Sequence, residues 1–433
     1  MGLCLPSGRY RPHGRGGNVT AASPLRAYGA VTAAYWAFML SDGALRMLVL
    51  LHFNALGFSP VQLAWLFLLY EVAGIVTNLA AGWLAARFGL AATLYGGLAL
   101  QIGTLLALGQ LDPGWSIAAS VGFVMAVQGV SGVAKDLAKM SSKSAVKLLA
   151  PSEDGGLFRW VAALTGSKNA VKGLGFFLGA ALLGLAGFQA AVWGMAAVLA
   201  AILLAVILFL PKGLPGRMKS AESWGGWRSR DPRVNRLSLA RMFLFGARDV
   251  WFVVGIPVYF QSVLSDGTPD GRREAFFLVG GFMALWIIAY GAVQAFAPRI
   301  LGGKAQPEAV VVRKAILWAG LLVPIPFALA LAAQIAGGPA PWLTVLLVAG
   351  LLLFGFVFAV NSSVHSYLIL AFGDASRITR DVGFYYMANA AGRLIGTLLS
   401  GLSYQAGGLP LCLTTAGIMA LASWWAARRL GDI

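Results

Sequence analysis

The sequence predicts an all-α membrane protein of twelve transmembrane helices arranged as two bundles of six. Three observations lead to this prediction. The chain of 433 residues is 59% hydrophobic and only 11% charged, whereas a soluble domain carries roughly 25% charged residues. Apolar runs long enough to cross a bilayer, which takes about 20 residues, fill most of the chain. Basic loops alternate with loops that lack Lys and Arg, as expected when a chain crosses a membrane repeatedly.

The N-terminal half is expected to consist of a tail and six spans. The tail, 1–26, contains Arg9, Arg11, Arg15 and Arg26 and lacks an apolar stretch before a cleavage site. We therefore expect a disordered cytoplasmic tail and no cleaved signal. The apolar runs of the first predicted bundle, 27–210, lie at 27–51, 60–83, 91–110, 116–138, 157–184 and 188–210.

A second set of six runs follows a polar linker. The linker, 211–235, is rich in Pro, Gly, Lys and Arg. The apolar runs of the second predicted bundle, 236–433, lie at 236–263, 274–297, 312–334, 341–368, 380–404 and 409–427. Weak internal repetition indicates a duplicated unit. Asn169 precedes Lys172 in the fifth run, and Asn389 precedes Arg393 in the eleventh.

The charges of the loops predict the orientation. Loops without Lys or Arg lie at 52–59, 185–187, 335–340 and 405–408. Loops that contain Lys or Arg lie at 84–90, 139–156, 211–235, 298–311 and 371–379. The exception is 264–273, where Arg272 and Arg273 occur together with acidic residues. Because cytoplasmic loops are enriched in Lys and Arg, we place the linker and both termini in the cytoplasm, which fits an even number of spans.

Several other functions find no support in the sequence. We find no nucleotide-binding loop of the Gly-x-x-x-x-Gly-Lys-[Ser/Thr] type, no hydrolase triad and no Cys/His cluster, and the two cysteines are Cys4 and Cys412. We therefore expect no enzyme activity, no cofactor and no metal. The net charge of +17 is expected to contact anionic lipid of the bilayer and no nucleic acid. We expect a monomer.

Ionisable side chains that we place within or at the ends of the predicted spans are mostly positive. Each costs about 2.5–3.5 kcal/mol at bilayer depth. The four anions are Asp42, Glu71, Asp136 and Asp249. The eight cations are Arg46, Lys135, Lys139, Lys168, Lys172, Arg241, Arg248 and Arg393. Because an unpaired buried charge is unfavourable, the excess of cations predicts a transporter for a negatively charged substrate.

Depth in the membrane selects a central group among these cations. Lys168, Arg248 and Arg393 lie about 11 to 13 residues into their spans, which is near the midplane at 1.5 Å per residue. Lys172 shares a helix face with Lys168 because the two are four residues apart, and Asn169 lies beside them. We predict that these side chains bind the substrate.

Two further helix faces are predicted to line the same site. Tyr385, Asn389 and Arg393 are spaced four residues apart in the eleventh span. Asp42 and Arg46 lie on one face of the first span, where they either form a structural ion pair or take part in transport.

Side chains nearer the cytoplasmic ends have more than one interpretation. Lys135, Lys139 and Arg241 either extend to water and lipid headgroups or contact the substrate. His365, the one histidine that we place near the cytoplasmic end of a span, fits helix packing better than ligand binding.

The acidic residues also leave alternatives open. Glu71 is either a proton-coupling carboxylate or the partner of a nearby cation. Arg248 and Asp249 are neighbours in the sequence, so we expect them to point apart and to use different partners. Asp249 then forms either a structural pair between the bundles or a contact with the substrate.

One loop motif resembles a known family. The turn Gly82-Trp-Leu-Ala-Ala-Arg87-Phe-Gly89 resembles the Gly-x-Leu-x-Asp-Arg-x-Gly signature of major facilitator transporters. Ala86 stands where that signature has Asp, so this chain lacks the acid that forms a contact between the two halves in the family.

Longer segments resemble the organoarsenical efflux permeases of the ArsJ type within that superfamily. The resemblance covers the chain from about residue 27 to its end, and four segments show it best: Tyr35–Arg46, Gly132–Met140, Leu164–Gly179 and Ala240–Val254. It implies the major facilitator fold, a bacterial cytoplasmic (inner) membrane and a functional link to a glyceraldehyde-3-phosphate dehydrogenase. That enzyme makes 1-arseno-3-phosphoglycerate, which the permease exports.

The implied substrate fits the predicted excess of cations. It carries a phosphate and an arsenate group, so Lys168 and Lys172 are expected to face one group, and Arg248 and Arg393 the other. Two alternatives remain open at this point. The same fold could transport another organic anion, such as an organophosphate, or the chain could be a membrane scaffold or lipid-handling protein that transports nothing.

Overall fold

A computed structural model describes residues 22–149, 156–209, 229–302, 306–372 and 378–431, and every regular element in these ranges is a helix. The elements of the N-terminal half are α1 (Ala22–Ala55), α2 (Pro60–Leu66), α3 (Leu68–Leu108), α4 (Ile117–Leu149) and α5 (Gly156–Phe209). Those of the C-terminal half are α6 (Pro232–Val250), the π-helix η1 (Trp251–Gly255), α7 (Ile256–Leu264), α8 (Pro269–Ile300), α9 (Glu308–Leu322), α10 (Pro324–Ala336), α11 (Pro341–Phe372) and α12 (Ile378–Arg428). Most of the predicted tail and linker lies outside the described residues.

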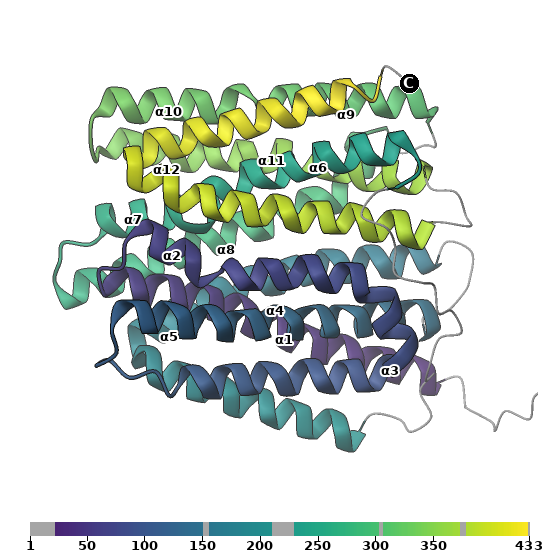
Figure 1. Cartoon of the computed structure of the whole chain (residues 1–433), viewed down its shortest axis with the longest axis horizontal. Helices are drawn as coiled ribbons and strands as arrows, with labels where there is room; N and C mark the ends of the chain where they lie inside the picture. Colours follow the sequence, from purple (N-terminus) through teal and green to yellow (C-terminus); the bar gives the residue numbers. More distant parts are fainter. Residues whose placement is uncertain (1–21, 150–155, 210–228, 303–305, 373–377, 432–433) are drawn as a thin grey trace, which may run out of the picture.

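The helices run along one axis of the molecule and form two groups. In Figure 1, α1, α3, α4 and α5 are labelled in the lower part of the view, α6 and α9–α12 in the upper part, and α2, α7 and α8 between them. Among the described residues, ten segments are long and apolar enough to cross a membrane. Each sequence-predicted span overlaps one of these segments, although the span at 157–184 begins ten residues before its segment, 167–209. The prediction of a multi-pass helical membrane protein is therefore confirmed at this level.

Three long elements change direction at glycines. An unbroken helix of 54 residues, the length of α5, would measure about 81 Å at 1.5 Å per residue, far more than the roughly 30 Å of a hydrocarbon core. Gly187 interrupts α5 with φ 78°, and Gly89 interrupts α3 with φ 74°. In α12 the break falls at Gly407 and Gly408. Glycine suits these turns because it adopts positive φ without the steric cost of a Cβ atom.

The path from α6 to α7 contains the π-helix η1. Pro257 follows it and has no backbone N–H to donate to the preceding turn. The backbone N–H groups of Val254 and Gly255 donate to the hydroxyl of Ser400 on α12, each at 3.2 Å. A side chain of a neighbouring helix therefore accepts hydrogen bonds from backbone groups at the irregular turn.

Small residues let the two halves approach closely. Helix α5 packs against α8, and α3 packs against α12. Gly173 on α5 lies against Ala284 and Ile288 of α8. Gly401 on α12 lies so near α2 that an added Cβ would come 2.5 Å from the carbonyl oxygen of Pro60. The chain thus brings its halves together as helix pairs with backbones in close approach.

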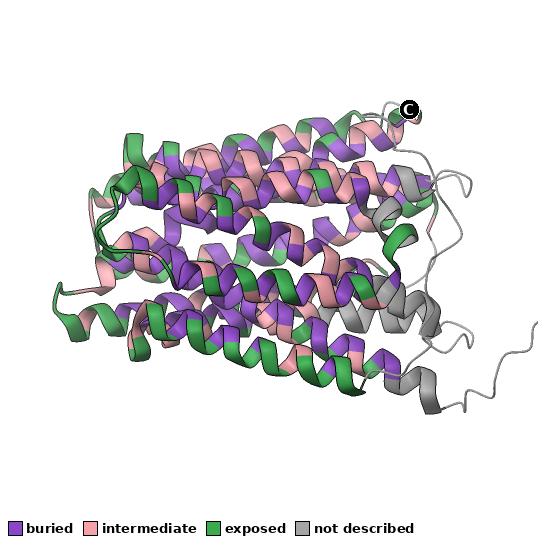
Figure 2. Cartoon of the chain, turned by 60° about the horizontal axis from the view of Figure 1, so that its bottom comes forward, coloured by how far each residue is buried: buried purple, intermediate pink, exposed green. Residues whose placement is uncertain are grey.

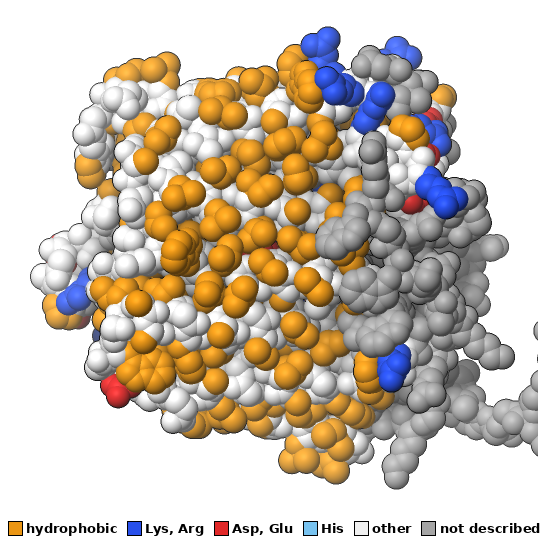
Figure 3. Space-filling model, viewed as in Figure 1, with side chains coloured by type: hydrophobic (Ala, Val, Ile, Leu, Met, Phe, Trp, Pro, Cys, Tyr) orange, Lys and Arg blue, Asp and Glu red, His pale blue; other side chains and the backbone are white. Residues whose placement is uncertain are grey.

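The outer surface is apolar between two polar ends. Figure 2 shows exposed residues on the outward faces of the helices and buried ones between them. Hydrophobic side chains cover the middle of the face in Figure 3, and most visible Lys and Arg side chains gather at its right-hand end. Exposed residues such as Leu185, Phe209 and Ile335 are 63%, 80% and 71% exposed. A lipid bilayer is the environment in which such a surface is stable.

Candidate functional site

A chain of ion pairs lies where the two halves meet. Glu71 on α3 accepts from Arg46 of α1 at 3.1 Å and from Arg393 of α12 at 2.6 Å. Arg393 also donates from Nε to Asp249 of α6 at 3.3 Å. Asp249 in turn accepts from Nη2 of Arg248 at 2.5 Å. Arg393 therefore holds a carboxylate of the N-terminal half and one of the C-terminal half at the same time.

A second cluster joins α1, α3 and α5. The Nζ atom of Lys172 lies 2.6 Å from Oδ2 of Asp42, and the hydroxyl of Tyr70 donates to Oδ1 of Asp42 at 2.6 Å. Lys135 of α4 lies over the ring of Tyr70, 4.0 Å from its centroid. Gly43, next to Asp42, is so close to α5 that an added Cβ would come 2.5 Å from the carbonyl oxygen of Lys172. This close packing of α1 on α5 sets the positions of the Asp42 and Lys172 side chains.

A third cluster surrounds Asp136 on α4. It accepts a hydrogen bond from the hydroxyl of Thr77 and forms an ion pair with Lys139 at 3.4 Å. Lys139 also donates to Oδ1 of Asn78 at 2.9 Å. The ring of Tyr386 on α12 lies 5.5 Å from the same ammonium group, so this cluster too extends across the two halves.

Neutral polar side chains connect the halves through α5 and α8. Asn169 donates to Gln294 at 3.0 Å, and Gln294 donates to Ser362 of α11 at 3.3 Å. Arg241 of α6 donates to the carbonyl and the hydroxyl of Ser362 at 2.9 and 3.0 Å and to Asn389 at 3.2 Å. Tyr385, which is fully buried, lies 5.1 Å from Arg241. Sequence-predicted residues from both halves therefore belong to one polar layer.

The cations of this layer are more accessible than the acids. The side chains of Lys172 and Arg393 are 17% and 20% exposed, whereas those of Asp42 and Glu71 are 2% and 1% exposed. Lys168 lies half-buried one turn from Lys172 on α5. An anion that entered the layer would therefore meet positive side chains before it met carboxylates.

The structure does not show one pairing that the sequence left open, and it contradicts one expectation about pairing. Asp42 does not form an ion pair with Arg46, four residues away. Asp42 instead pairs with Lys172 of α5, and Arg46 pairs with Glu71 of α3, because these helices pack against α1. Arg248 and Asp249 do not use separate partners. The long side chain of Arg248 bends back and contacts the neighbouring carboxylate, while the other oxygen of Asp249 accepts from Arg393.

Several neutral members of the layer were not predicted from the sequence. Tyr70, Asn78, Thr77 and Gln294 all hydrogen-bond to charged or amide side chains of the layer. Polar residues inside apolar spans are a signal that could have found them. Among the described residues, no group of three or more His, Cys, Asp or Glu side chains could hold a metal ion.

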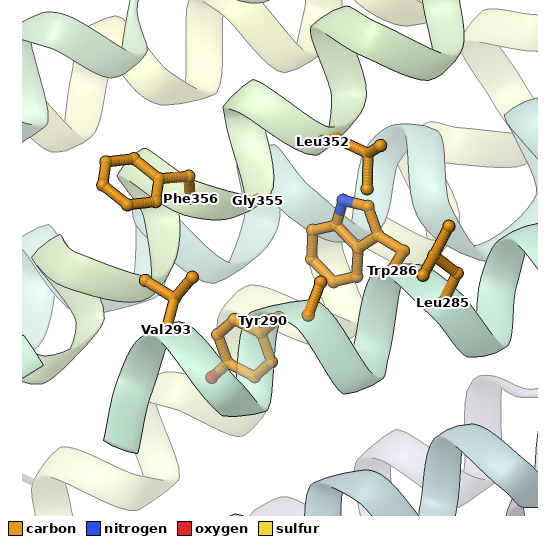
Figure 4. Close-up of a pocket in the computed structure, with 8 residues that line it drawn as sticks. Leu285, Trp286, Tyr290, Val293, Leu352, Gly355 and Phe356 are labelled. Atoms are coloured by element: carbon orange, nitrogen blue, oxygen red, sulfur yellow. The ribbon is translucent and has the colours of Figure 1, made fainter. Parts of the chain in front are cut away.

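A separate pocket of about 300 Å³ lies between α8 and α11. Figure 4 shows Trp286 and Tyr290 of α8 beside Leu352 and Phe356 of α11. Phe356 and Leu285 at its rim are 39% and 52% exposed, so the pocket opens on the outer surface. Its lining is almost entirely apolar, which does not fit an anionic ligand.

Comparisons with known proteins agree with this architecture. The model of the Major Facilitator Superfamily matches residues 31–369. No curated protein matches the sequence. Among solved structures, a nucleoside transporter, NupG, in a point-mutant form superimposes with a TM-score of 0.68 at 17% identity, covering 94% of this chain and 99% of that one. A transporter of the POT family in complex with 5-aminolevulinic acid gives 0.69 at 15% identity, covering 94% and 96%. At this identity the solved structures show the fold alone. Since the family match spans most of the sequence, the chain belongs to the Major Facilitator Superfamily.

Proposed function

We propose that this membrane transporter exports an anionic organoarsenical, 1-arseno-3-phosphoglycerate, and thereby confers resistance to arsenate. The observation that carries the proposal is the excess of positive charge in the polar layer. Eight Lys and Arg side chains accompany four carboxylates there, and each carboxylate already contacts at least one cation. A substrate with two anionic groups would neutralise the remaining charge.

The two cationic clusters suit the two groups of this substrate. Lys168 and Lys172 would bind one group, and Arg248 and Arg393 the other. Further side chains of the layer would complete the site: Arg46, Lys135, Lys139, Asn169, Tyr385 and Asn389. An arginine presents a planar pair of donors that matches the oxygens of phosphate or arsenate.

Arg393 gives the site a route to alternating access. Its guanidinium links Glu71 of one half to Asp249 of the other. A bound anion would compete with these carboxylates for the same donors, which weakens the link between the halves. The halves could then rock about the substrate, as in transporters built from two repeats.

We also propose the finer topology that the charge pattern predicts. The ten candidate spans become twelve when 167–209 and 381–428 are each divided at their glycine turns. This division gives two six-helix bundles, 27–210 and 236–433, with both termini in the cytoplasm of a bacterial cell. We expect a monomer that works beside a glyceraldehyde-3-phosphate dehydrogenase.

A different organic anion, such as an organophosphate, is the main alternative. It would use the same cations, so the two proposals differ in their dependence on arsenate and on the dehydrogenase. A scaffold or lipid-handling role is less compatible with the layer, because its cations contact acids and amides between helices.

Resistance of growing cells tests the proposal. An arsenate-sensitive strain that expresses the dehydrogenase and this chain should survive arsenate, and neither protein alone should suffice. Lys172→Gln and Arg393→Gln should each abolish resistance at normal expression. If both variants keep full resistance, the assignment of these side chains to the substrate is wrong.

A further inference from the structure

Helices α6 and α11 face each other in a register that their contacts define. The rings of Phe245 and Phe358 lie 5.1 Å apart. Four residues earlier on α6 and four residues later on α11, Arg241 donates to Ser362. The two helices therefore run antiparallel. Ser238 lies three residues before Arg241 on α6, and His365 lies three residues after Ser362 on α11. The same register therefore places Ser238 opposite His365.

Buried polar atoms without hydrogen-bond partners gather in this part of α6 and α11. They are Oγ of Ser238, both amide atoms of Asn361 and both ring nitrogens of His365. These three residues are 1%, 0% and 0% exposed. Asn361 and His365 are four residues apart and share one face of α11. Because buried polar groups in native proteins are almost always hydrogen-bonded, these atoms have capacity to bind a polar group.

Arg241 supplies an uncompensated charge beside these atoms. Its Nε and Nη1 atoms donate to neutral groups only, on Ser362 and Asn389. Among the ion pairs of the described residues, none includes Arg241, in contrast to Arg46, Arg248 and Arg393. Its guanidinium carbon lies over the ring of Phe245, 4.2 Å from the ring centroid. His365 lies within electrostatic range of this charge.

We propose that Ser238, Arg241, Asn361 and His365 form a binding site for a tetrahedral oxyanion of the phosphate monoester class within the C-terminal half. Arg241 supplies the positive charge and donates from Nη2. The hydroxyl of Ser238, the amide of Asn361 and one ring N–H of His365 supply neutral donors. A tetrahedral oxyanion accepts hydrogen bonds from several directions at once, so it can satisfy donors that come from two facing helices.

This site differs from the layer of ion pairs described above. There, a substrate would compete with a carboxylate for Arg46, Lys172, Arg248 or Arg393, whereas no carboxylate of the described residues forms an ion pair with Arg241. A role for the site in export rests on the proposed function. Because both anionic groups of the bound substrate are assigned there to other cations, this site would hold a phosphate group at a different step of transport. The binding chemistry itself does not depend on that function.

The test measures the binding of 3-phosphoglycerate and inorganic phosphate to the full chain purified in detergent. Thermal unfolding is followed as a function of ligand concentration, because a ligand that binds the folded state raises the apparent Tm. We expect a saturable increase for the wild type. Arg241→Gln, Asn361→Leu and Ser238→Ala should each weaken the apparent affinity at least tenfold. Arg313→Gln, which removes an exposed charge from α9, should leave it unchanged.

Three outcomes overturn the proposal. The first is that neither ligand raises the apparent Tm of the wild type. The second is that Asn361→Leu and Ser238→Ala bind the ligands with wild-type affinity, and the third is that Arg313→Gln loses as much affinity as the other variants. If Arg241→Gln fails to fold, the affinities of Asn361→Leu and Ser238→Ala, which both keep Arg241, still test the proposal. If water rather than an oxyanion occupies the site, Asn361→Leu and Ser238→Ala will keep wild-type affinity for the ligands. If the wild type exports the arsenical but binds neither 3-phosphoglycerate nor phosphate, only the proposal of this site is refuted. Binding without arsenical export would refute the proposed function alone.

Discussion

At the scale of single residues, Glu71 is the carboxylate that forms ion pairs with arginines of both halves of the molecule. One of its oxygens accepts from Arg46 and from Arg393, and its side chain is 1% exposed. Removing one partner from a buried ion pair leaves an uncompensated charge and costs about 3–5 kcal/mol. An exposed pair is worth about 0–1 kcal/mol.

Glu71→Gln should therefore lower the free energy of unfolding by about 3–5 kcal/mol, because two arginines lose their carboxylate. Combining it with Arg393→Gln should recover part of the loss, since one buried charge is then gone. Reversible unfolding in mixed detergent micelles measures both effects. Glu308→Gln, whose partner Arg233 is 36% exposed, is the control. A loss in Glu71→Gln no larger than in the control contradicts the account.

The sequence predicted the charged residues of the layer but not their partners. Depth in the span identified Lys168, Arg248 and Arg393 as central, and helical spacing added Lys172. Pairing depends on how helices rotate against one another, and this rotation is set by close glycine contacts such as that of Gly43 with α5. For this reason the contact of Asp42 with Lys172 could not be foreseen from spacing along one helix.

At the scale of elements, the least regular segment is the path from α6 through η1 to α7. Apolar runs predicted one span there, and Pro257 was the available sign of a break. The compensation comes from another element, since the Ser400 hydroxyl of α12 accepts from Val254 and Gly255. Sequence reasoning could not supply this partner because it lies 146 residues from Val254.

Ser400→Ala should destabilise the protein by about 1–3 kcal/mol, because it leaves buried backbone donors without this acceptor. Ser403→Ala on the same helix removes a hydroxyl that bonds only within α12, to Leu399. That variant should stay close to the wild type. Thermal unfolding in detergent compares the two. Equal stability of both variants would show that the Ser400 hydroxyl does not support the π-helix.

At the scale of the whole molecule, polar contacts join the halves at the end of the bundle where α1 meets α7. Asn54 donates to Gln261 at 2.7 Å, and the backbone of Val61 donates to Gln405 at 3.3 Å. Gly401 packs on Pro60 at the same end. The multi-pass helical fold was predictable because hydropathy and loop charge are local properties of the sequence. The way the halves meet was not, because it depends on contacts between residues far apart in the chain.

Gly401→Ala should shift the transporter toward a state that is open at this end. Its Cβ would come 2.5 Å from the carbonyl oxygen of Pro60, which separates α12 from α2. A cysteine introduced by Asn54→Cys should then react several-fold faster with a membrane-impermeant thiol reagent. Gly281→Ala, which meets open space, should have no effect. Unchanged labelling in Gly401→Ala would mean that this contact does not hold the halves together.

The proposed function holds that an excess of buried cations selects a doubly anionic organoarsenical. Uptake of arsenic into everted membrane vesicles tests it most directly, with 1-arseno-3-phosphoglycerate generated outside them by the dehydrogenase, with and without a proton gradient. The account predicts saturable uptake that requires the dehydrogenase and falls at least tenfold in Arg393→Gln. Uptake of free arsenate at the same rate without the dehydrogenase, or full uptake by Arg393→Gln, would contradict it.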